Sequence, residues 1–258
     1  MKIRQIRNAT MRIEFGDKCF LTDPWLQDVG TIPPFGPVHR IPNPTVPLPM
    51  KILDILKGVD AYIVTHIHPD HFDIEKDENG TIVGGRRLNK FVKVFVQNAD
   101  DQKFIEDSGF VNPEILSESG TRFGNVELIK TSGIHGTKKT AGTAMGIIMR
   151  AENEKTLYIA GDTIYCRDVE QTLLKYRPAV VIANACAAYT PETGRLIMDG
   201  GDLVKIHQIL PDAVIIASHM DAVNHAAITR NELKMQMQEA GIMEHIIIPN
   251  DGDPATAF

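Results

Sequence analysis

The chain has few cysteines, no long apolar run and no excess of basic residues, and each shortage excludes a class of protein. Its three cysteines, Cys19, Cys166 and Cys186, are widely spaced and form no CxxC pair. This argues against a disulfide framework or a thiolate zinc knuckle and favours a reducing compartment. No stretch approaches ~18 uninterrupted apolar residues, and residues 1–7 alternate charged and aliphatic side chains without the apolar core of a signal peptide. We therefore expect a soluble, cytoplasmic protein with no membrane insertion.

The charge balance is also informative about partners. The 27 Lys and Arg residues against 33 Asp and Glu residues give a net charge of −6, which opposes binding to a polyanion such as nucleic acid. A small-molecule substrate is the better expectation, and an oligomer is possible but not readable. The 258 residues, 43% of them hydrophobic, are sufficient for one large core, so a single domain over residues 1–258 is predicted.

Apolar runs separated by turn residues predict alternating strands and helices. The predicted strands are Lys2–Arg7, Met11–Phe15, Lys18–Thr22, Ala61–Val64, Phe91–Val96, Val126–Thr131, Thr143–Arg150, Thr156–Ala160, Ala179–Ala183, Ala213–Ala217 and His245–Ile248. Helices are predicted around residues 52–56, before Gly109, over Arg167–Tyr176, around 203–210, and from the capping-box pair Thr229 and Glu232 to Ala240. Seven prolines between Asp28 and Met50 predict an extended surface loop, of a length often found in active-site lids.

The segment Thr65-His66-Ile67-His68-Pro69-Asp70-His71 follows the apolar run 61–64 and places three imidazoles and one carboxylate within six positions. Imidazole nitrogen and carboxylate oxygen are the ligands that borderline divalent cations such as zinc accept. His66 and His68 project to one face at a strand end. Pro69 suits the first position of a helix, which would carry Asp70 and His71 elsewhere. Two adjacent ligand sets indicate two metals.

Five polar residues each follow a predicted strand by one to four positions: Asp23, His66, His135, Asp162 and His219. Side chains at strand ends converge in layered α/β folds because the sheet holds the backbone rigidly while the following loops are free to meet. Taken alone, His135 fits an ordinary loop histidine and Asp162 fits a helix N-cap. Their place in this ordered series favours one shared metal site.

With these positions in hand, the chain resembles the metallo-β-lactamase-fold hydrolases, whose HxHxDH signature is matched by His66, His68, Asp70 and His71. The lone histidine of Ser132-Gly133-Ile134-His135, the step Gly161-Asp162-Thr163 and the strand-terminal histidine of Ala217-Ser218-His219 follow in the same order. Asn8-Ala9-Thr10, Leu21-Thr22-Asp23-Pro24-Trp25 and the lack of an appended domain are similar to the branch that contains L-ascorbate-6-phosphate lactonase. Relatives commonly carry histidine where this chain has Asn8.

The resemblance implies a four-layer αββα sandwich within the α/β class and a seven-residue ligand set. His66, His68 and His135 would hold one metal. Asp70, His71 and His219 would hold the second, the Asp162 carboxylate would bridge both, and Asp23 would orient a ligand imidazole. The cofactors would be two divalent ions, zinc first, with manganese or iron as alternatives. Cysteine stands at the Asp162 position in the best-known β-lactamases, so the fold name does not predict that activity.

The implied function is a binuclear metal-dependent hydrolase that uses a metal-bridging hydroxide on a small ester, lactone or phosphoester, with Asp70 orienting the hydroxide. The alternatives are a phosphodiesterase (phospholipase D-like or nuclease), a mononuclear iron persulfide dioxygenase, and a non-catalytic binding protein. Four histidines fall outside the predicted ligand set: His39, His207, His225 and His245. His225 fits either the pocket or the surface, whereas Cys166 and Cys186 are interpreted as packing residues.

Overall fold

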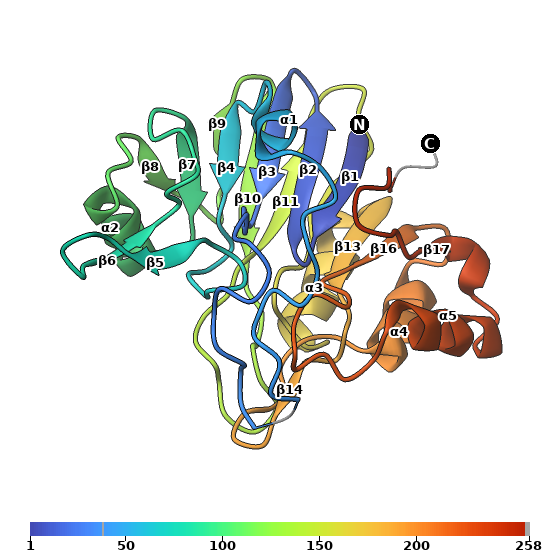
Figure 1. Ribbon diagram of the computed structural model, residues 1–258. Coiled ribbons are helices and arrows are strands. Elements are labelled where there is room, and N and C mark those ends of the chain that lie inside the picture. Colours follow the sequence, from blue (N-terminus) through green and yellow to red (C-terminus); the bar gives the residue numbers. More distant parts are fainter. Residues whose placement is uncertain (38, 256–258) are drawn as a thin grey trace.

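Two mixed β-sheets lie face to face in the computed structural model, which describes residues 1–37 and 39–255 (Figure 1). The first sheet has the order β1-β2-β3-β4-β7-β8, formed by β1 (Lys2–Arg7), β2 (Thr10–Phe15), β3 (Lys18–Thr22), β4 (Ala61–Ile63), β7 (Lys93–Val96) and β8 (Pro113–Ile115). The second has the order β17-β16-β13-β12-β11-β10-β9, formed by β9 (Thr121–Phe123), β10 (Val126–Thr131), β11 (Gly146–Arg150), β12 (Leu157–Ile159), β13 (Val180–Asn184), β16 (Val214–Ser218) and β17 (Ile246–Ile247).

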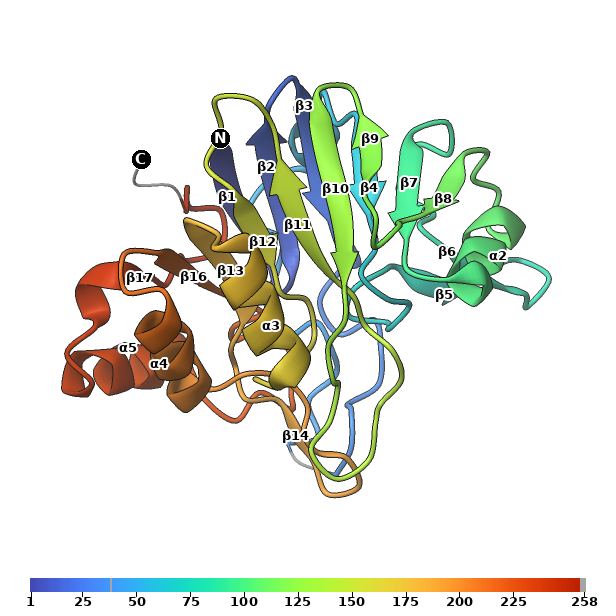
Figure 2. The ribbon, with the colours of Figure 1, turned by 180° about the vertical axis from the view of Figure 1, so that it is seen from behind.

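Helices cover the outer face of each sheet. The helices are α1 (Ile52–Leu56), α2 (Ala99–Asp107), α3 (Arg167–Tyr176), α4 (Gly200–Ile209), α5 (Arg230–Glu239) and the 3₁₀ turn η1 (Met243–His245). Figures 1 and 2 show α3, α4 and α5 on the second sheet and α2 beside the first. None of the helices in the described ranges is long and apolar enough to cross a bilayer. The predicted four-layer αββα sandwich of the metallo-β-lactamase fold is therefore confirmed.

Three apolar cores correspond to the three interfaces between these layers. In β4, Ala61 and Ile63 belong to the core between the sheets, whereas Tyr62 belongs to the core beneath α1 and α2. Because both faces of β4 are buried, its sequence reads as a continuous apolar run rather than an alternation. The third core lies between the second sheet and α3, α4 and α5.

The predicted elements are present, with three kinds of difference. Six short strands were not predicted: β5 (Ile74–Lys76), β6 (Ile82–Gly84), β8, β9, β14 (Tyr189–Thr190) and β15 (Gly194–Arg195). Two or three residues are too few to show a period of two, so only pairing partners define them. Three predicted strands were too long, because His245 lies in η1, β7 begins at Lys93 rather than Phe91, and β11 begins at Gly146 rather than Thr143. The helix predicted at Pro69 was wrong: residues 69–71 form a turn, with the His71 and Phe72 amides both donating to the His68 carbonyl.

The predicted capping box of α5 is confirmed, since the Thr229 hydroxyl accepts from the Glu232 amide and the Glu232 carboxylate accepts from the Thr229 amide. The N-cap of α3 is Cys166, so Asp162 is not a helix cap. This removes the competing interpretation of Asp162.

The carboxyl ends of β3, β4, β10, β12 and β16 meet at one edge of the sandwich, where Figure 1 shows the long connecting loops gathered around β14. The backbone there adopts demanding conformations. Asn8, Asp23 and His219 have φ of 53°, 42° and 62°, a left-handed region in which Asn, Asp and His are enriched. Gly161 has φ of 69°, and a Cβ there would lie 2.3 Å from the Met145 carbonyl oxygen, so only glycine fits before Asp162.

Candidate metal centre

The structure brings all seven predicted ligands together. Three overlapping groups have potential ligand atoms within 4.8 Å of one another: His66, His68 and His135; His66, His71 and Asp162; and Asp70, His71 and His219. The first and third groups are the two triplets that the family resemblance implied, and the second places Asp162 between them. Residues delivered by different strand ends therefore form one cluster.

In the first half of the cluster, histidine ring nitrogens face one another. His66 Nε2 lies 2.8 Å from His68 Nδ1, and the His135 ring centroid lies within 5.4 Å of both rings. His135 Nε2 lies 3.8 Å from Asp162 Oδ2. Two imidazole nitrogens can approach this closely only when a proton or a cation lies between them. This half thus has the donor geometry of a three-nitrogen cation site next to a carboxylate.

The second half combines nitrogen and oxygen donors. His219 Nε2 lies 3.2 Å from His71 Nε2 and 3.2 Å from Asp70 Oδ2. Asp162 Oδ2 lies 3.2 Å from His71 Nε2 and 3.9 Å from His219 Nε2. The same oxygen lies 3.8 Å from His135 Nε2, so it faces both halves. The other oxygen, Asp162 Oδ1, accepts a 2.6 Å hydrogen bond from Asn184 Nδ2, which holds the carboxylate in this orientation.

The second ring nitrogen of His66, His71, His135 and His219 is also engaged, as is usual for metal ligands. Asp23 Oδ2 lies 2.9 Å from His71 Nδ1, and the Asp23 carboxylate in turn accepts from the amide and hydroxyl of Thr65. This is the orienting contact predicted for Asp23. His135 Nδ1 donates to the Leu196 carbonyl at 3.1 Å. These contacts aim the Nε2 atoms of His71 and His135 at the centre of the cluster.

Two groups beside the cluster were not predicted to lie there. Cys186 Sγ lies 3.6 Å from His219 Nδ1, although Cys186 was interpreted as a packing residue. Asn8 Nδ2 lies 3.2 Å from His219 Nε2 and donates to the Asp70 carbonyl at 2.9 Å. For Asn8 the sequence held a signal, because its family counterpart is often histidine. For Cys186 it held none, since a lone cysteine after a buried strand reads as packing.

The electrostatics of the cluster favour positive charge. Burial alone would lower the pKa of His71, but the surrounding carboxylates, Asp162 foremost, raise it to about 10. The same opposition, with Asp162 again outweighing burial, raises the pKa of His219 well above its usual value. In contrast, burial and neighbouring histidines lower the pKa values of His66 and His68. The carboxylate side thus attracts protons or cations, while His66 and His68 offer neutral nitrogens.

This donor set fits a pair of divalent cations. Neutral imidazole nitrogens and carboxylate oxygens suit zinc and neighbouring transition metals, and the Asp162 oxygen that both halves share has the position of a bridging ligand. Metal binding here also explains the crowding, because buried imidazoles and carboxylates in such numbers need charge compensation.

A cavity of about 220 Å³ opens onto the cluster. Four of the proposed ligands line it, namely His68, Asp70, His135 and Asp162. Its other walls include Phe35 from the proline-rich loop, Leu196 and His225. Among the described residues, no lysine or arginine lines this cavity. His225, which sequence reasoning left between pocket and surface, is therefore a pocket residue.

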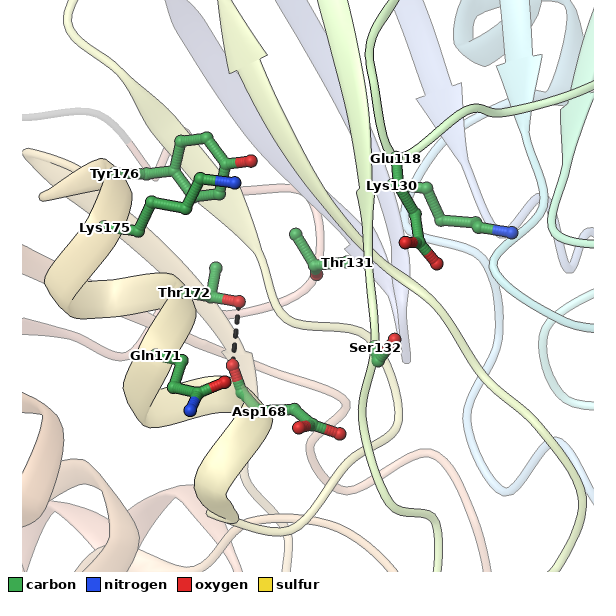
Figure 3. A pocket seen from close by; sticks show the side chains of 9 residues that line it. All are labelled: Glu118, Lys130, Thr131, Ser132, Asp168, Gln171, Thr172, Lys175 and Tyr176. Atoms are coloured by element: carbon green, nitrogen blue, oxygen red, sulfur yellow. Dashed lines mark hydrogen bonds between the residues drawn. The ribbon is translucent and has the colours of Figure 1, made fainter.

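A second cavity of about 300 Å³ lies between α3 and the end of β10 (Figure 3). It is lined by polar side chains and by charged side chains of both signs, including Lys130, Lys175, Glu118 and Asp168. Within the described part of the chain, no group of potential metal ligands includes any residue of this cavity. The chemistry is therefore assigned to the smaller cavity.

Asn224 fastens the proline-rich loop over the candidate site. Its Oδ1 accepts from the Phe35 amide and from Asn43 Nδ2, each at 2.8 Å. Its Nδ2 donates to the carbonyls of Phe35 and His39, at 3.0 and 2.9 Å. These bonds hold the part of the loop that places Phe35 in the cavity wall. The predicted loop at residues 28–50 is thus anchored next to the cluster.

Replacing Asn224 with alanine is expected to loosen this loop without unfolding the protein. Each lost hydrogen bond contributes about 1 kcal/mol, so cleavage by trypsin at the exposed Arg40 should become at least ~10-fold faster. Mass spectrometry of the fragments 1–40 and 41–258 measures the rate. The exposed turn residue Asn79, changed to alanine, provides the matched control. Equal cleavage rates in the Asn224 variant and the wild type would show that the loop is held by other contacts.

The comparisons with known proteins agree with this geometry. The family described as "Beta-lactamase superfamily domain" matches residues 18–220, which include every proposed ligand. The "UPF0173 protein YddR" of Bacillus subtilis (strain 168) is 39% identical in sequence to this chain over 262 residues. The match covers 99% of this chain and 100% of YddR.

Two solved structures share both fold and sequence. The crystal structure of isothiocyanate hydrolase from Delia radicum gut bacteria is 34% identical with a TM-score of 0.90, covering 100% of this chain and 99% of that chain. The crystal structure of a possible metal-dependent hydrolase from Veillonella parvula DSM 2008 is 34% identical with a TM-score of 0.89, and 98% of each chain is covered.

Proposed function

Because the chain belongs to the beta-lactamase superfamily, in its UPF0173 group of metal-dependent hydrolases, we propose that it uses two cations to hydrolyse a small, uncharged electrophile. The observation that carries the proposal is the convergence of three ligand groups, which overlap through His66 and His71, beside one cavity. Zinc is the proposed metal, with manganese and iron as alternatives, because nitrogen and oxygen donors select weakly among these ions.

Bound cations would lower the pKa of a water molecule towards ~7 and withdraw electrons from the substrate. The chain's own residues supply the positioning. Asp70 lies both in the cluster and in the cavity wall, so its carboxylate is placed to orient the attacking water. Asp23 holds the His71 ring, and Asn184 holds the Asp162 carboxylate.

The cavity favours an uncharged substrate. A phosphorylated substrate is normally gripped by arginine or lysine, and none of the described residues that line the cavity is either. Phe35, Ala141 and Leu196 instead offer apolar contact for a substituent. These features support a compact molecule with one electrophilic carbon and an apolar tail.

An isothiocyanate, R–N=C=S, has these properties, and the neighbour with a TM-score of 0.90 is described as an isothiocyanate hydrolase. In the proposed reaction, the oxygen of water bonds to the central carbon and the C–N bond breaks. The nitrogen takes up both protons of water, so that R–N=C=S and H₂O give R–NH₂ and O=C=S. A small ester or lactone, as in the lactonase-like branch, is the second candidate, because it also has one electrophilic carbon.

The remaining candidates are less well supported. A phosphodiester would bring a negative charge into a cavity whose described residues include no lysine or arginine. A mononuclear iron oxygenase would leave the third group of donors, Asp70, His71 and His219, without a metal. A binding protein without activity would need no such donor set.

The metal-loaded protein is expected to contain about two equivalents of metal per chain and to hydrolyse benzyl isothiocyanate, with loss of activity in His68→Ala. Elemental analysis measures the metal content per chain, and the release of benzylamine measures the rate of hydrolysis. A lactone and a phosphodiester are tested as alternative substrates. His207→Ala, which changes a half-buried histidine outside the cluster, is the control. One equivalent of iron would favour the oxygenase, and equal rates in His68→Ala and wild type would refute the proposed site.

A further inference from the structure

His225 has an unusual environment for a buried histidine. Its side chain lines the cavity beside the metal cluster and is only 7% exposed. Its ring packs edge-on against Phe35, with ring centroids 5.1 Å apart and an interplanar angle of 80°. Nδ1 is buried and has no hydrogen-bond partner among the described residues. A buried imidazole in a protein normally has both nitrogens hydrogen-bonded. Because the His225 ring departs from this rule, it is available to contact a molecule that enters the cavity.

The backbone holds this ring in place. The His225 carbonyl accepts from the Tyr189 amide at 3.0 Å, which ties it to β14. The preceding residue, Asn224, is bonded to both the amide and the carbonyl of Phe35, the residue against which the ring packs. A side chain fixed from both sides is preorganised, and preorganised donors contribute most to binding and catalysis.

The unpaired Nδ1 indicates which tautomer the ring adopts. Burial lowers the pKa of His225 to about 4, so the ring is neutral near pH 7 and has one N–H. An N–H at Nδ1 would be orphaned, and orphaned buried N–H groups are rarer than orphaned acceptors. The proton therefore belongs on Nε2, the nitrogen left to meet solvent or substrate.

We infer that His225 is a substrate-contacting residue whose Nε2–H donates a hydrogen bond to the terminal sulfur or oxygen of a small uncharged substrate. The inference rests on the proposed function and adds a residue to it. In the addition of water to R–N=C=S, negative charge develops on sulfur, and a neutral donor stabilises that charge without repelling the neighbouring cations. His225 and Phe35 would thus select substrates with an acceptor atom next to an apolar substituent.

Three substitutions separate this role from packing. Leucine at position 225 fills a similar volume but cannot donate, glutamine places an amide N–H near the Nε2 position, and asparagine reaches only the Nδ1 position. We expect His225→Leu and His225→Asn to lower kcat/KM for benzyl isothiocyanate by about 10- to 100-fold, mostly through kcat, and His225→Gln to recover most of it. Metal content should be unchanged in all three. Equal kcat/KM in His225→Leu and wild type would overturn the inference.

Two further measurements test the role of His225 even if the protein does not hydrolyse isothiocyanates. In NMR spectra, the ring ¹⁵N signals that disappear in His225→Gln belong to His225. At pH 7 these signals should show that Nε2 is protonated and Nδ1 is not. A protonated Nδ1 would overturn the assignment. Calorimetry with benzylthiourea, an uncharged and unreactive thiocarbonyl compound, should show binding that is about 10-fold weaker in His225→Leu. Absence of binding to the wild type would also overturn it. Failure of hydrolysis alone, with both results as expected, would refute the proposed reaction only.

Discussion

Asp162→Asn is expected to lose at least one of the two metal equivalents and to lower kcat by about 10³-fold or more, since a shared cation pair contributes several kcal/mol to the transition state. The reason lies in the orientation of the side chain. Asn184 donates to Asp162 Oδ1, so the amide oxygen of the variant would take that position and its NH₂ would face the nitrogens of His71 and His135. A donor group in that place cannot bind a cation.

Elemental analysis and chelator competition measure the loss directly, without reference to any substrate. The matched control is Asp168→Asn, which makes the same chemical change at an exposed carboxylate in the first turn of α3. Retention of two equivalents of metal in the Asp162 variant would contradict the bridging role, whichever reaction the protein catalyses.

Asp23→Asn is expected to weaken metal binding by about 10- to 100-fold while leaving the fold intact, which is the usual effect of removing the partner of a ligand imidazole. Asp23 Oδ2 lies 2.9 Å from His71 Nδ1 and also accepts from Thr65, so it fixes both the ring and the start of the ligand-bearing segment. Asparagine is the appropriate replacement because position 23 has φ of 42°, which asparagine tolerates and alanine does not.

Titration with a chelating indicator gives the dissociation constants, and thermal unfolding of the metal-free protein gives stability. Asp60→Asn is the control, because the Asp60 carboxylate also accepts from a backbone amide, that of Cys19, away from the cluster. Unchanged metal affinity in Asp23→Asn, or an equal change in Asp60→Asn, would show that the contact between Asp23 and His71 does not support the metals.

Much of the candidate site was readable from the sequence because its ligands follow strands that are recognisable in isolation. β4 is a buried apolar run, and the histidines directly after it can point only to the sheet edge. The same reasoning placed His135, Asp162 and His219 at that edge, and the two triplets that the family resemblance implied are two of the three groups that the structure brings together. Local spacing also predicted the capping box of α5.

Other features followed from no local pattern. Pro69 suited a helix start, yet the chain forms a turn there, because the positions of His68 and His71 depend on contacts with Asp23, His135 and other distant residues. The short strand β14 exists only through its pairing with β15.

The amino-acid sequence was sufficient for the layered α/β class and for the candidate metal ligands, because both depend on residue types at short separations along well-formed strands. The surroundings of His225, Cys186 and Asn224 were decided by the folded chain alone. Each contacts a partner far away in sequence: Phe35 for His225 and Asn224, and His219 for Cys186. Burial and an unpaired nitrogen are properties of packing between separate loops, and packing between distant segments leaves no periodic trace in the sequence.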